Sequence, residues 1–333
     1  MSKVKIEDLT KNYVLSTNFI KEITGRRNFV NAVSEVSLNI AQGEILGVVG
    51  ESGCGKTTLG KMLINLEKPT NGQILIDGND ISKIKRKERL KFHKDVQMIF
   101  QDPFDSLNPK MTVFDIISEP IHSLKLIKGR SNIKSKVIEV LEQVDLSPAE
   151  YFLNKFPNKL SGGQRQRIAI ARAIVVNPNF IIADEPVSML DVSIRAGILN
   201  LLKKLNYEKG VGILFITHDL ATARFLCNRI AVMYLGRVVE LIKSKRIMKH
   251  SLHPYTNLLL ESAPDLFSNE TEKIIVKGEA ANATMPPQGC RFAPRCPFAE
   301  SKCIEEDQHL TFVDKGKRNH EVACWKTLEE NLF

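Results

Sequence analysis

Residues 50–58 place three glycines, a lysine and two threonines between an apolar run, 45–49, and the start of a helix at 59–64. The apolar run has the pattern of a buried strand. A strand, a glycine-rich turn and a helix N-terminus together aim backbone N–H groups at one point, where the helix dipole favours an anion. Lys56 would then reach the β- and γ-phosphates of a nucleotide, and the Thr57 hydroxyl would hold Mg²⁺.

The spacing Gly50-x-x-x-x-Gly55-Lys56-Thr57 matches the Walker A pattern in its required context. An ordinary glycine-rich turn is the alternative, and the strand–loop–helix context disfavours it. Gly50, Gly53 and Gly55 are expected to let the backbone come close to this anion, because a Cβ would block the approach. The residues expected to bind nucleotide here are Gly50, Glu51, Ser52, Gly53, Cys54, Gly55, Lys56, Thr57 and Thr58.

Two further apolar runs end in polar residues that suit phosphate chemistry. The run 180–183 delivers Asp184, placed to bind Mg²⁺ through water, and Glu185, which could polarise an attacking water. The run 212–216 brings His218 to the same edge of the predicted sheet. A lone histidine at a strand end is more often structural, but this one shares an edge with a phosphate loop and two acids.

Gln101 and the stretch around Ser161 complete the candidate site. Gln101 follows the predicted strand 96–100, where a polar side chain is well placed for a ligand. Ser161 can cap a helix expected over 164–176, and Gly162 and Gly163 before Gln164 expose backbone N–H groups. This stretch therefore predicts a second anion site, without a lysine of its own.

Composition sets the class of protein. The 333 residues, 43% hydrophobic and 26% charged, predict a soluble globular chain with room for a large and a smaller domain. No apolar run of about eighteen residues predicts a membrane span, and no apolar signal core stands at the N-terminus, so we expect a cytosolic location. The net charge of +9 admits nucleic acid, nucleotides or an anionic membrane surface as partners.

Local patterns predict the remaining elements. Helical periodicity runs through 107–160, where Ile133, Val137, Leu141 and Val144 recur on one face. Basic residues over 83–94 predict a solvated helix face, with contact to anionic lipid as the weaker reading. We also expect strands at 4–6, 33–40, 72–78, 230–234 and 237–240, a surface loop at 16–28, a basic helix before 248, and linkers at 262–264 and 285–287.

Four of the six cysteines gather near the C-terminus, with the spacing Cys290-x5-Cys296-x6-Cys303-x20-Cys324. A reducing compartment disfavours disulfides. A region with so few apolar residues nevertheless needs some crosslink to hold a fold. The number and type of ligand suit one metal site, but the spacing is neither that of a zinc knuckle nor that of a ferredoxin. Free structural thiols remain an alternative, and Cys54 and Cys227 are expected to be ordinary buried cysteines.

Taken together, these residues resemble an ATPase subunit of an ABC transporter over nearly the whole chain. Residues 160–164 match the ABC signature, 180–185 match Walker B with its glutamate, Gln101 falls at the Q-loop, 188–191 at the D-loop and His218 at the switch histidine. Residues 101–109, 253–256 and 289–297 resemble the oligopeptide/dipeptide importer branch, most closely the second of its two ATPases. Met189 departs from the alanine usual in the D-loop.

The resemblance implies an α/β fold: a P-loop ABC ATPase with a RecA-like core, an antiparallel β part and a helical subdomain, plus a small Cys-rich C-terminal domain. The nucleotide-binding domain would span 1–250, with its helical insertion at about 104–177, and the extension 251–333. The resemblance implies that Glu185, His218 and Gln101 are catalytic, and that Thr57, Gln101 and Asp184 hold Mg²⁺. ATP would also contact Tyr13, Gln101, Asp184, Ser161, Gly162, Gly163, Gln164 and Asp191, with Phe29 as the alternative to Tyr13 for stacking on adenine. Cys290, Cys296, Cys303 and Cys324 would hold a [4Fe–4S] cluster, with zinc as the alternative.

The implied function is ATP hydrolysis that powers peptide import. The implied partners are a second homologous ATPase in a head-to-tail heterodimer, two transmembrane permease subunits and an extracellular solute-binding protein, with no nucleic acid. The subunit would lie peripherally on the cytoplasmic face of the cell membrane. Alternatives are an importer of nickel or another small solute, an ABC ATPase acting on ribosomes or DNA, and a metal-sensing or redox protein.

Overall fold

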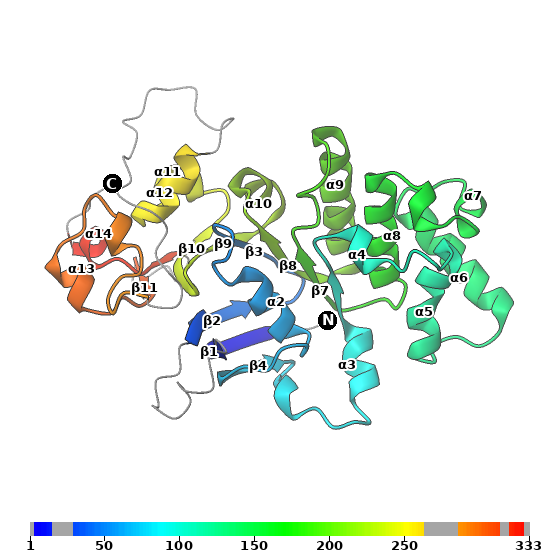
Figure 1. Cartoon of the computed structure of the whole chain (residues 1–333), viewed down its shortest axis with the longest axis horizontal. Coiled ribbons are helices and arrows are strands. Elements are labelled where there is room, and N and C mark those ends of the chain that lie inside the picture. Colours follow the sequence, from blue (N-terminus) through cyan, green and yellow to red (C-terminus); the bar gives the residue numbers. More distant parts are fainter. Residues whose placement is uncertain (1–2, 15–28, 263–285, 314–319, 330–333) are drawn as a thin grey trace, which may run out of the picture. The chain divides into compact units, whose positions relative to one another are not determined.

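The structure, a computed structural model, describes residues 3–14, 29–262, 286–313 and 320–329, which form two compact units interleaved along the chain (Figure 1). The first unit comprises Met1–Lys3, Ile40–Ile45 and Lys83–Ile216; the second comprises Val4–Asn39, Leu46–Ser82 and Thr217–Phe333. The expected loop at 16–28 and half of the residues in the two expected linkers (263, 264 and 285) lie outside the described residues. The expected domain boundary at residue 250 stays a prediction.

The first unit is built on three parallel strands in the order β8-β7-β6. Phe180 in β7 lies opposite Val96 in β6 and Gly212 in β8. A Cβ on Gly212 would lie only 3.0 Å from the Phe180 ring, so glycine leaves room for that ring. The continuous apolar runs form strands buried on both faces, as the sequence predicts. The bounds are β6 (Val96–Ile99), β7 (Phe180–Asp184) and β8 (Gly212–Thr217).

The helices of the first unit fall largely where the helical insertion is expected. The predicted apolar face is confirmed, since Ile133, Val137, Leu141 and Val144 are all buried. Thr112 and Asp115 form a capping box that starts α5. The bounds are α3 (Arg89–Asp95), α4 (Pro103–Ser106), α5 (Val113–Ser123), α6 (Arg130–Gln143), α7 (Glu150–Leu153), η2 (Pro157–Lys159), α8 (Gly162–Ile174) and α9 (Val192–Lys209).

Two expected helix boundaries need correction. Helix α8 begins at Gly162 rather than at 164, because the Ser161 side chain already accepts a hydrogen bond from the Gln164 N–H at 3.3 Å. The basic stretch 83–94 is α-helical only from Arg89 onward. Before this helix lie a short 3₁₀ element, which ends at Lys83, and a turn.

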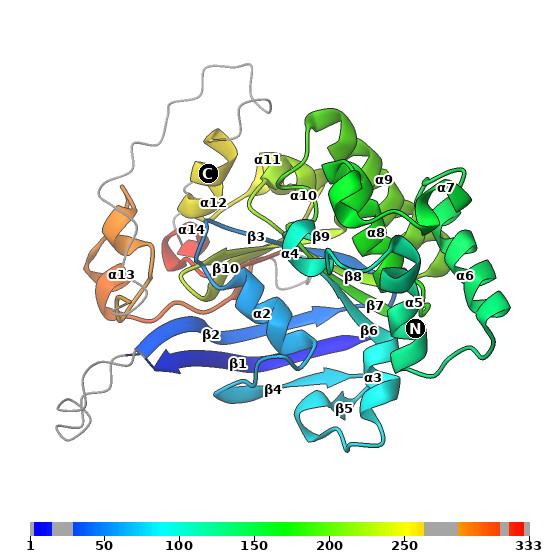
Figure 2. The ribbon, with the colours of Figure 1, turned by 45° about the vertical axis from the view of Figure 1, so that its right-hand side comes forward.

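The second unit contains two groups of strands. One is the antiparallel sheet β2-β1-β4-β5, in which Val4 of β1 lies opposite Ile76 of β4 (Figure 2). In the other, of order β11-β12-β10-β9-β3, only the β3–β9 pair is parallel. The strands are β1 (Val4–Val14), β2 (Phe29–Ile40), β3 (Ile45–Val49), β4 (Asn71–Ile76), β5 (Asn79–Asp80), β9 (Arg229–Tyr234), β10 (Arg237–Lys243), β11 (Thr311–Phe312) and β12 (His320–Val322).

The helices of the second unit are short. Helix α2 follows the glycine-rich loop and buries Leu59, Met62 and Leu63, which fixes its direction after β3. None of the helices in the described part of the chain is both long and apolar enough to cross a membrane. The bounds are α2 (Lys56–Leu63), η1 (Ile81–Lys83, which ends in the first unit), α10 (Leu220–Leu226), α11 (Ile247–His250), α12 (Pro254–Glu261), η3 (Ala293–Arg295), α13 (Ser301–Glu305) and α14 (Trp325–Glu329).

A buried carboxylate joins the C-terminal strands to helix α12. Glu240 of β10 is fully buried, and it accepts hydrogen bonds from the backbone N–H groups of Leu252 at 2.8 Å and His253 at 3.1 Å. His320 of β12 lies 2.7 Å from the same carboxylate. His253 then caps α12 by accepting from the Tyr255 N–H through Nδ1. Burial lowers the pKa of His253 to about 4, which keeps the ring in the neutral form that this cap requires.

We predict that Glu240→Leu lowers the free energy of unfolding by about 2–5 kcal/mol, because one buried N–H group, one partly buried N–H group and one imidazole lose their partner. Denaturant unfolding monitored by circular dichroism measures the change. Glu139→Leu, on the exposed face of α6, is the control and should cost less than about 1 kcal/mol. Equal effects of the two substitutions would show that the Glu240 network does not stabilise the fold.

Candidate functional site

The glycine-rich loop between β3 and α2 is held in shape by its glycines. A Cβ on Gly50 would overlap the Met233 carbonyl oxygen, and a Cβ on Gly55 would overlap that of Ala32. Gly53 differs, because a Cβ there would meet nothing within 4 Å; its φ of +78° is what favours glycine. Close approach of the three glycines to a bound phosphate stays a prediction.

Lys56 lies inside this loop. Its Nζ donates to the carbonyl oxygens of Gly50 at 2.7 Å and Glu51 at 2.9 Å, and the residue is only 5% exposed. The Cys54 sulfur lies 3.8 Å from the same nitrogen. Burial raises the pKa of the Cys54 thiol, so this sulfur stays protonated and neutral beside the ammonium. A cation enclosed by backbone at a helix N-terminus can bind a phosphate chain.

Glu51 ties the loop to the C-terminal region. Its backbone N–H donates to the Tyr255 hydroxyl at 2.9 Å, and its carboxylate accepts from both terminal nitrogens of Arg295 at 2.9–3.2 Å. Neither Arg295 nor Tyr255 was expected as part of the site. The signal that could have found them is their place in 289–297 and 253–256, the stretches that resemble the peptide-importer branch.

The first unit brings Gln101 and Glu185 together. The Gln101 side-chain amide donates to a Glu185 carboxylate oxygen at 3.3 Å. The Glu185 N–H donates to the Ile216 carbonyl at 2.9 Å, and its φ of +45° turns the chain sharply at the end of β7. Asp184, the last residue of that strand, is 2% exposed. An amide that follows β6 and two acids at the end of the neighbouring parallel strand β7 can position a cation and a water.

The signature residues form the start of α8. Ser161 is exposed at the N-cap. Gly163 is buried against Ile194, and a Cβ at this position would lie only 2.5 Å from the Ile194 side chain. Asp191 is the N-cap residue of α9, and both it and Met189 are exposed. The signature also meets the D-loop stretch, since a Cβ on Gly162 would lie 3.7 Å from the buried Leu190 side chain. Ser161, Met189 and Asp191 remain exposed on this unit.

His218, Tyr13 and Phe29 belong to the second unit. His218 is exposed between β8 and α10, next to Asp219, which caps α10. Tyr13 is half-buried near the end of β1, with the Lys11 ammonium 4.9 Å from its ring centre. Phe29 begins β2 and is 39% exposed. Which of the two aromatic rings stacks on adenine stays a prediction, and so does the role of His218.

The four C-terminal cysteines line one cavity, together with Phe292, Phe298 and Trp325. The Cys290 N–H donates to the Cys303 carbonyl at 2.7 Å, and the Trp325 indole N–H points to the Cys303 sulfur at 3.3 Å. Burial raises the pKa of the Cys290 thiol to about 12 and that of Cys296 to about 11, so these thiols are protonated until something replaces the protons. Cys54 and Cys227, as expected, are buried elsewhere.

The ligand type bears on which metal fits. Thiolates are ligands of iron–sulfur clusters and of tetrahedral zinc. Four thiols around an apolar cavity are therefore a donor set that suits either group.

Comparisons with known proteins place this geometry in a family. Residues 33–188 match the family described as ABC transporter, and 239–303 match the oligopeptide/dipeptide transporter C-terminal region. The putative oligopeptide transport ATP-binding protein YkfD of Bacillus subtilis is 45% identical over 90% of this chain and 91% of its own length. The oligopeptide transport ATP-binding protein AppF of the same organism is 43% identical over 96% of each chain.

Solved structures agree with the sequence relatives. The ATP-binding cassette MJ0796, in a dimeric post-hydrolysis state bound to ADP and Pi, has a TM-score of 0.64 and 34% identity, covering 72% of this chain and 98% of its own. The cbiO1 protein of Clostridium perfringens, part of the cbiONQ transporter complex, has a TM-score of 0.61 and 29% identity, covering 73% and 89%.

The expected P-loop ABC ATPase fold and the resemblance to the peptide-importer branch are therefore confirmed. The chain belongs to the ATP-binding, ATP-hydrolysing subunits of ABC transporters, in the group that carries the oligopeptide/dipeptide transporter C-terminal region.

Proposed function

We propose that this chain powers peptide import by hydrolysing ATP on the cytoplasmic face of a membrane. One observation carries the proposal: the phosphate loop with its enclosed Lys56 and the oligopeptide/dipeptide C-terminal region occur in one chain. Relatives over nearly the full length are named as oligopeptide transport or peptide import proteins, which supports peptide as the transported solute.

The proposed roles follow from charge and position. Lys56 neutralises the β- and γ-phosphates, and the Thr57 hydroxyl, Asp184 and Gln101 hold Mg²⁺. Glu185 orients the attacking water and accepts its proton, since Gln101 contacts its carboxylate and the turn after β7 fixes its backbone. His218 contacts the γ-phosphate side of the nucleotide.

Assembly is proposed from the exposed signature. Ser161 and Asp191 face outward from the first unit, where they suit contact with nucleotide bound to another ATPase. The proposed complex contains a second homologous ATPase arranged head to tail, two transmembrane permease subunits and an extracellular solute-binding protein. The dimeric state of the MJ0796 cassette supports this arrangement.

We also propose that Cys290, Cys296, Cys303 and Cys324 hold one [4Fe–4S] cluster in a Cys-rich C-terminal domain. The apolar cavity, the four thiols that line it and the match to the oligopeptide/dipeptide transporter C-terminal region support it. When bound, the cluster would crosslink four points of a segment that has few large apolar residues. Its proposed role is structural or regulatory, with no part in hydrolysis. Binding requires the thiols to lose their protons, so uptake of iron should weaken as pH falls.

We predict that Lys56→Ala weakens binding of MgATP about tenfold to a hundredfold, because a charge-assisted contact to phosphate contributes roughly 1.5–3 kcal/mol. Isothermal titration calorimetry on the full chain measures the affinity. Lys61→Ala, in the last turn of the same helix, is the matched control and should change it less than about twofold. Unchanged affinity in Lys56→Ala would remove this loop from nucleotide binding.

Glu185→Gln should lower ATP turnover by the assembled complex about a hundredfold to ten-thousandfold while MgATP still binds, because only the base is lost. Turnover and affinity are measured side by side, with the partner ATPase carrying the equivalent substitution. Glu208→Gln, on the exposed side of α9, controls for the change of charge. Wild-type turnover in Glu185→Gln would assign the base elsewhere.

Anaerobic purification with metal analysis tests the cysteine site. We expect about four irons and four sulfides per chain with a visible absorption band, and loss of both in Cys303→Ser but not in Cys227→Ser. One zinc and no colour would replace the proposed metal. Absence of metal with all four thiols open to alkylation would contradict a metal site there.

A further inference from the structure

Glu51 is the residue of the phosphate loop that the C-terminal region contacts. The Arg295 guanidinium makes contacts of 2.9, 3.1 and 3.2 Å with its two carboxylate oxygens. The Tyr255 hydroxyl accepts from the Glu51 backbone N–H at 2.9 Å, and Tyr255 is fully buried. A two-pronged guanidinium–carboxylate pair fixes direction as well as distance. Both the side chain and the backbone of one loop residue are therefore held from outside the loop.

Arg295 is itself held in place by buried aromatic rings. It donates to the Tyr234 hydroxyl at 3.3 Å, and its guanidinium carbon lies 5.8 Å from the ring centres of Tyr234 and Phe292. The rings of Tyr234, Tyr255 and Phe292 pack with centres 4.5–5.4 Å apart, and all three residues are at most 1% exposed. The rings of such a close-packed cluster have little freedom to move independently. A shift of one ring is therefore passed on to the residues packed against it.

The segment that presents Arg295 also carries the cysteines. Phe292 and Ala293 line the cysteine cavity, and the N–H groups of Arg295 and Cys296 both donate to the Phe292 carbonyl, at 2.9 and 3.0 Å. Arg295 therefore leaves a tight turn between Cys290 and Cys296. The position of its guanidinium depends on how that turn is held.

We propose that Arg295 is a positioning residue for the phosphate loop, through which the cysteine-bearing segment sets the affinity of the loop for nucleotide. The proposal rests on the proposed function, in which this loop binds a triphosphate. Arg295 acts in two ways. It fixes the direction of the Glu51 side chain, and it neutralises a carboxylate that would otherwise repel a polyphosphate bound in the same loop.

Arg295→Ala should weaken MgATP binding about tenfold, measured by calorimetry on the full chain purified anaerobically. Adding Glu51→Gln to that variant should restore affinity to within about threefold of wild type, because the uncompensated carboxylate is then gone. Recovery after losing a second group identifies an effect of charge on the ligand, which a merely structural role of Arg295 would not give.

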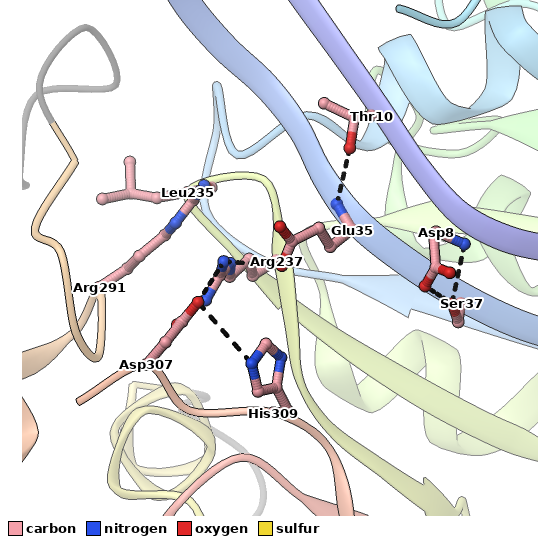
Figure 3. A network of polar contacts seen from close by, with 9 residues as sticks. All are labelled: Asp8, Thr10, Glu35, Ser37, Leu235, Arg237, Arg291, Asp307 and His309. Atoms are coloured by element: carbon pink, nitrogen blue, oxygen red, sulfur yellow. Dashed lines mark hydrogen bonds and ion pairs between the residues drawn. The ribbon is translucent and has the colours of Figure 1, made fainter. Parts of the chain in front are cut away.

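Asp307→Asn is the matched control. Asp307 also joins the C-terminal region to the body of the second unit, through an ion pair with Arg237 (Figure 3). Its side chain contacts Arg237 and His309, which lie outside the phosphate loop. The affinity of the Asp307→Asn variant for MgATP should stay within about twofold of wild type. Equal weakening by Asp307→Asn and Arg295→Ala, or no recovery in the Glu51→Gln double variant, would overturn the proposal.

Failure of this proposal can be told apart from failure of the proposed function. Unchanged affinity in Arg295→Ala together with weakened binding in Lys56→Ala would leave the loop as the nucleotide site and refute the role of Arg295. Unchanged affinity in both variants would refute both. Thermal unfolding of each variant is recorded in parallel, so that affinity is compared only between folded proteins.

Discussion

The phosphate loop can hold a triphosphate only if its backbone N–H groups keep fixed directions, and two kinds of contact enforce this. Gly50 and Gly55 lie against the backbone carbonyls of Met233 and Ala32, where any side chain would collide. Lys56 reaches back across the loop to two of its carbonyl groups. The loop is therefore shaped by its own packing as well as by the sequence pattern that identifies it.

The C-terminal region adds a second layer of support. Tyr255 and Arg295 meet the loop at Glu51, and behind them lie Tyr234 and Phe292, fully packed. The Glu240 network in turn fixes the start of α12, from which Tyr255 extends. A region that contributes no residue to the ATP motifs thus contacts the loop that defines the ATP site.

The sequence predicted what depends on neighbours along the chain. The buried run before Asp184 and the Ser161 cap are local, so pattern and propensity were enough to place them. The contacts of Glu51 join residues 204 and 244 positions apart, which no local pattern encodes. The helix predicted over 83–94 was too long at its N-terminal end, because a pattern of charges does not mark where a turn ends and a helix begins. The positive φ of Gly53 was not predicted, because motif spacing does not specify backbone dihedral angles.

The central claim is that ATP hydrolysis by this chain drives peptide import, and uptake by proteoliposomes holding the complete transporter tests it most directly. A labelled oligopeptide, presented with the solute-binding protein, should accumulate when MgATP is supplied on the side of this subunit and should not accumulate with MgADP. Uptake of nickel ions under the same conditions, without uptake of any peptide, would contradict the account.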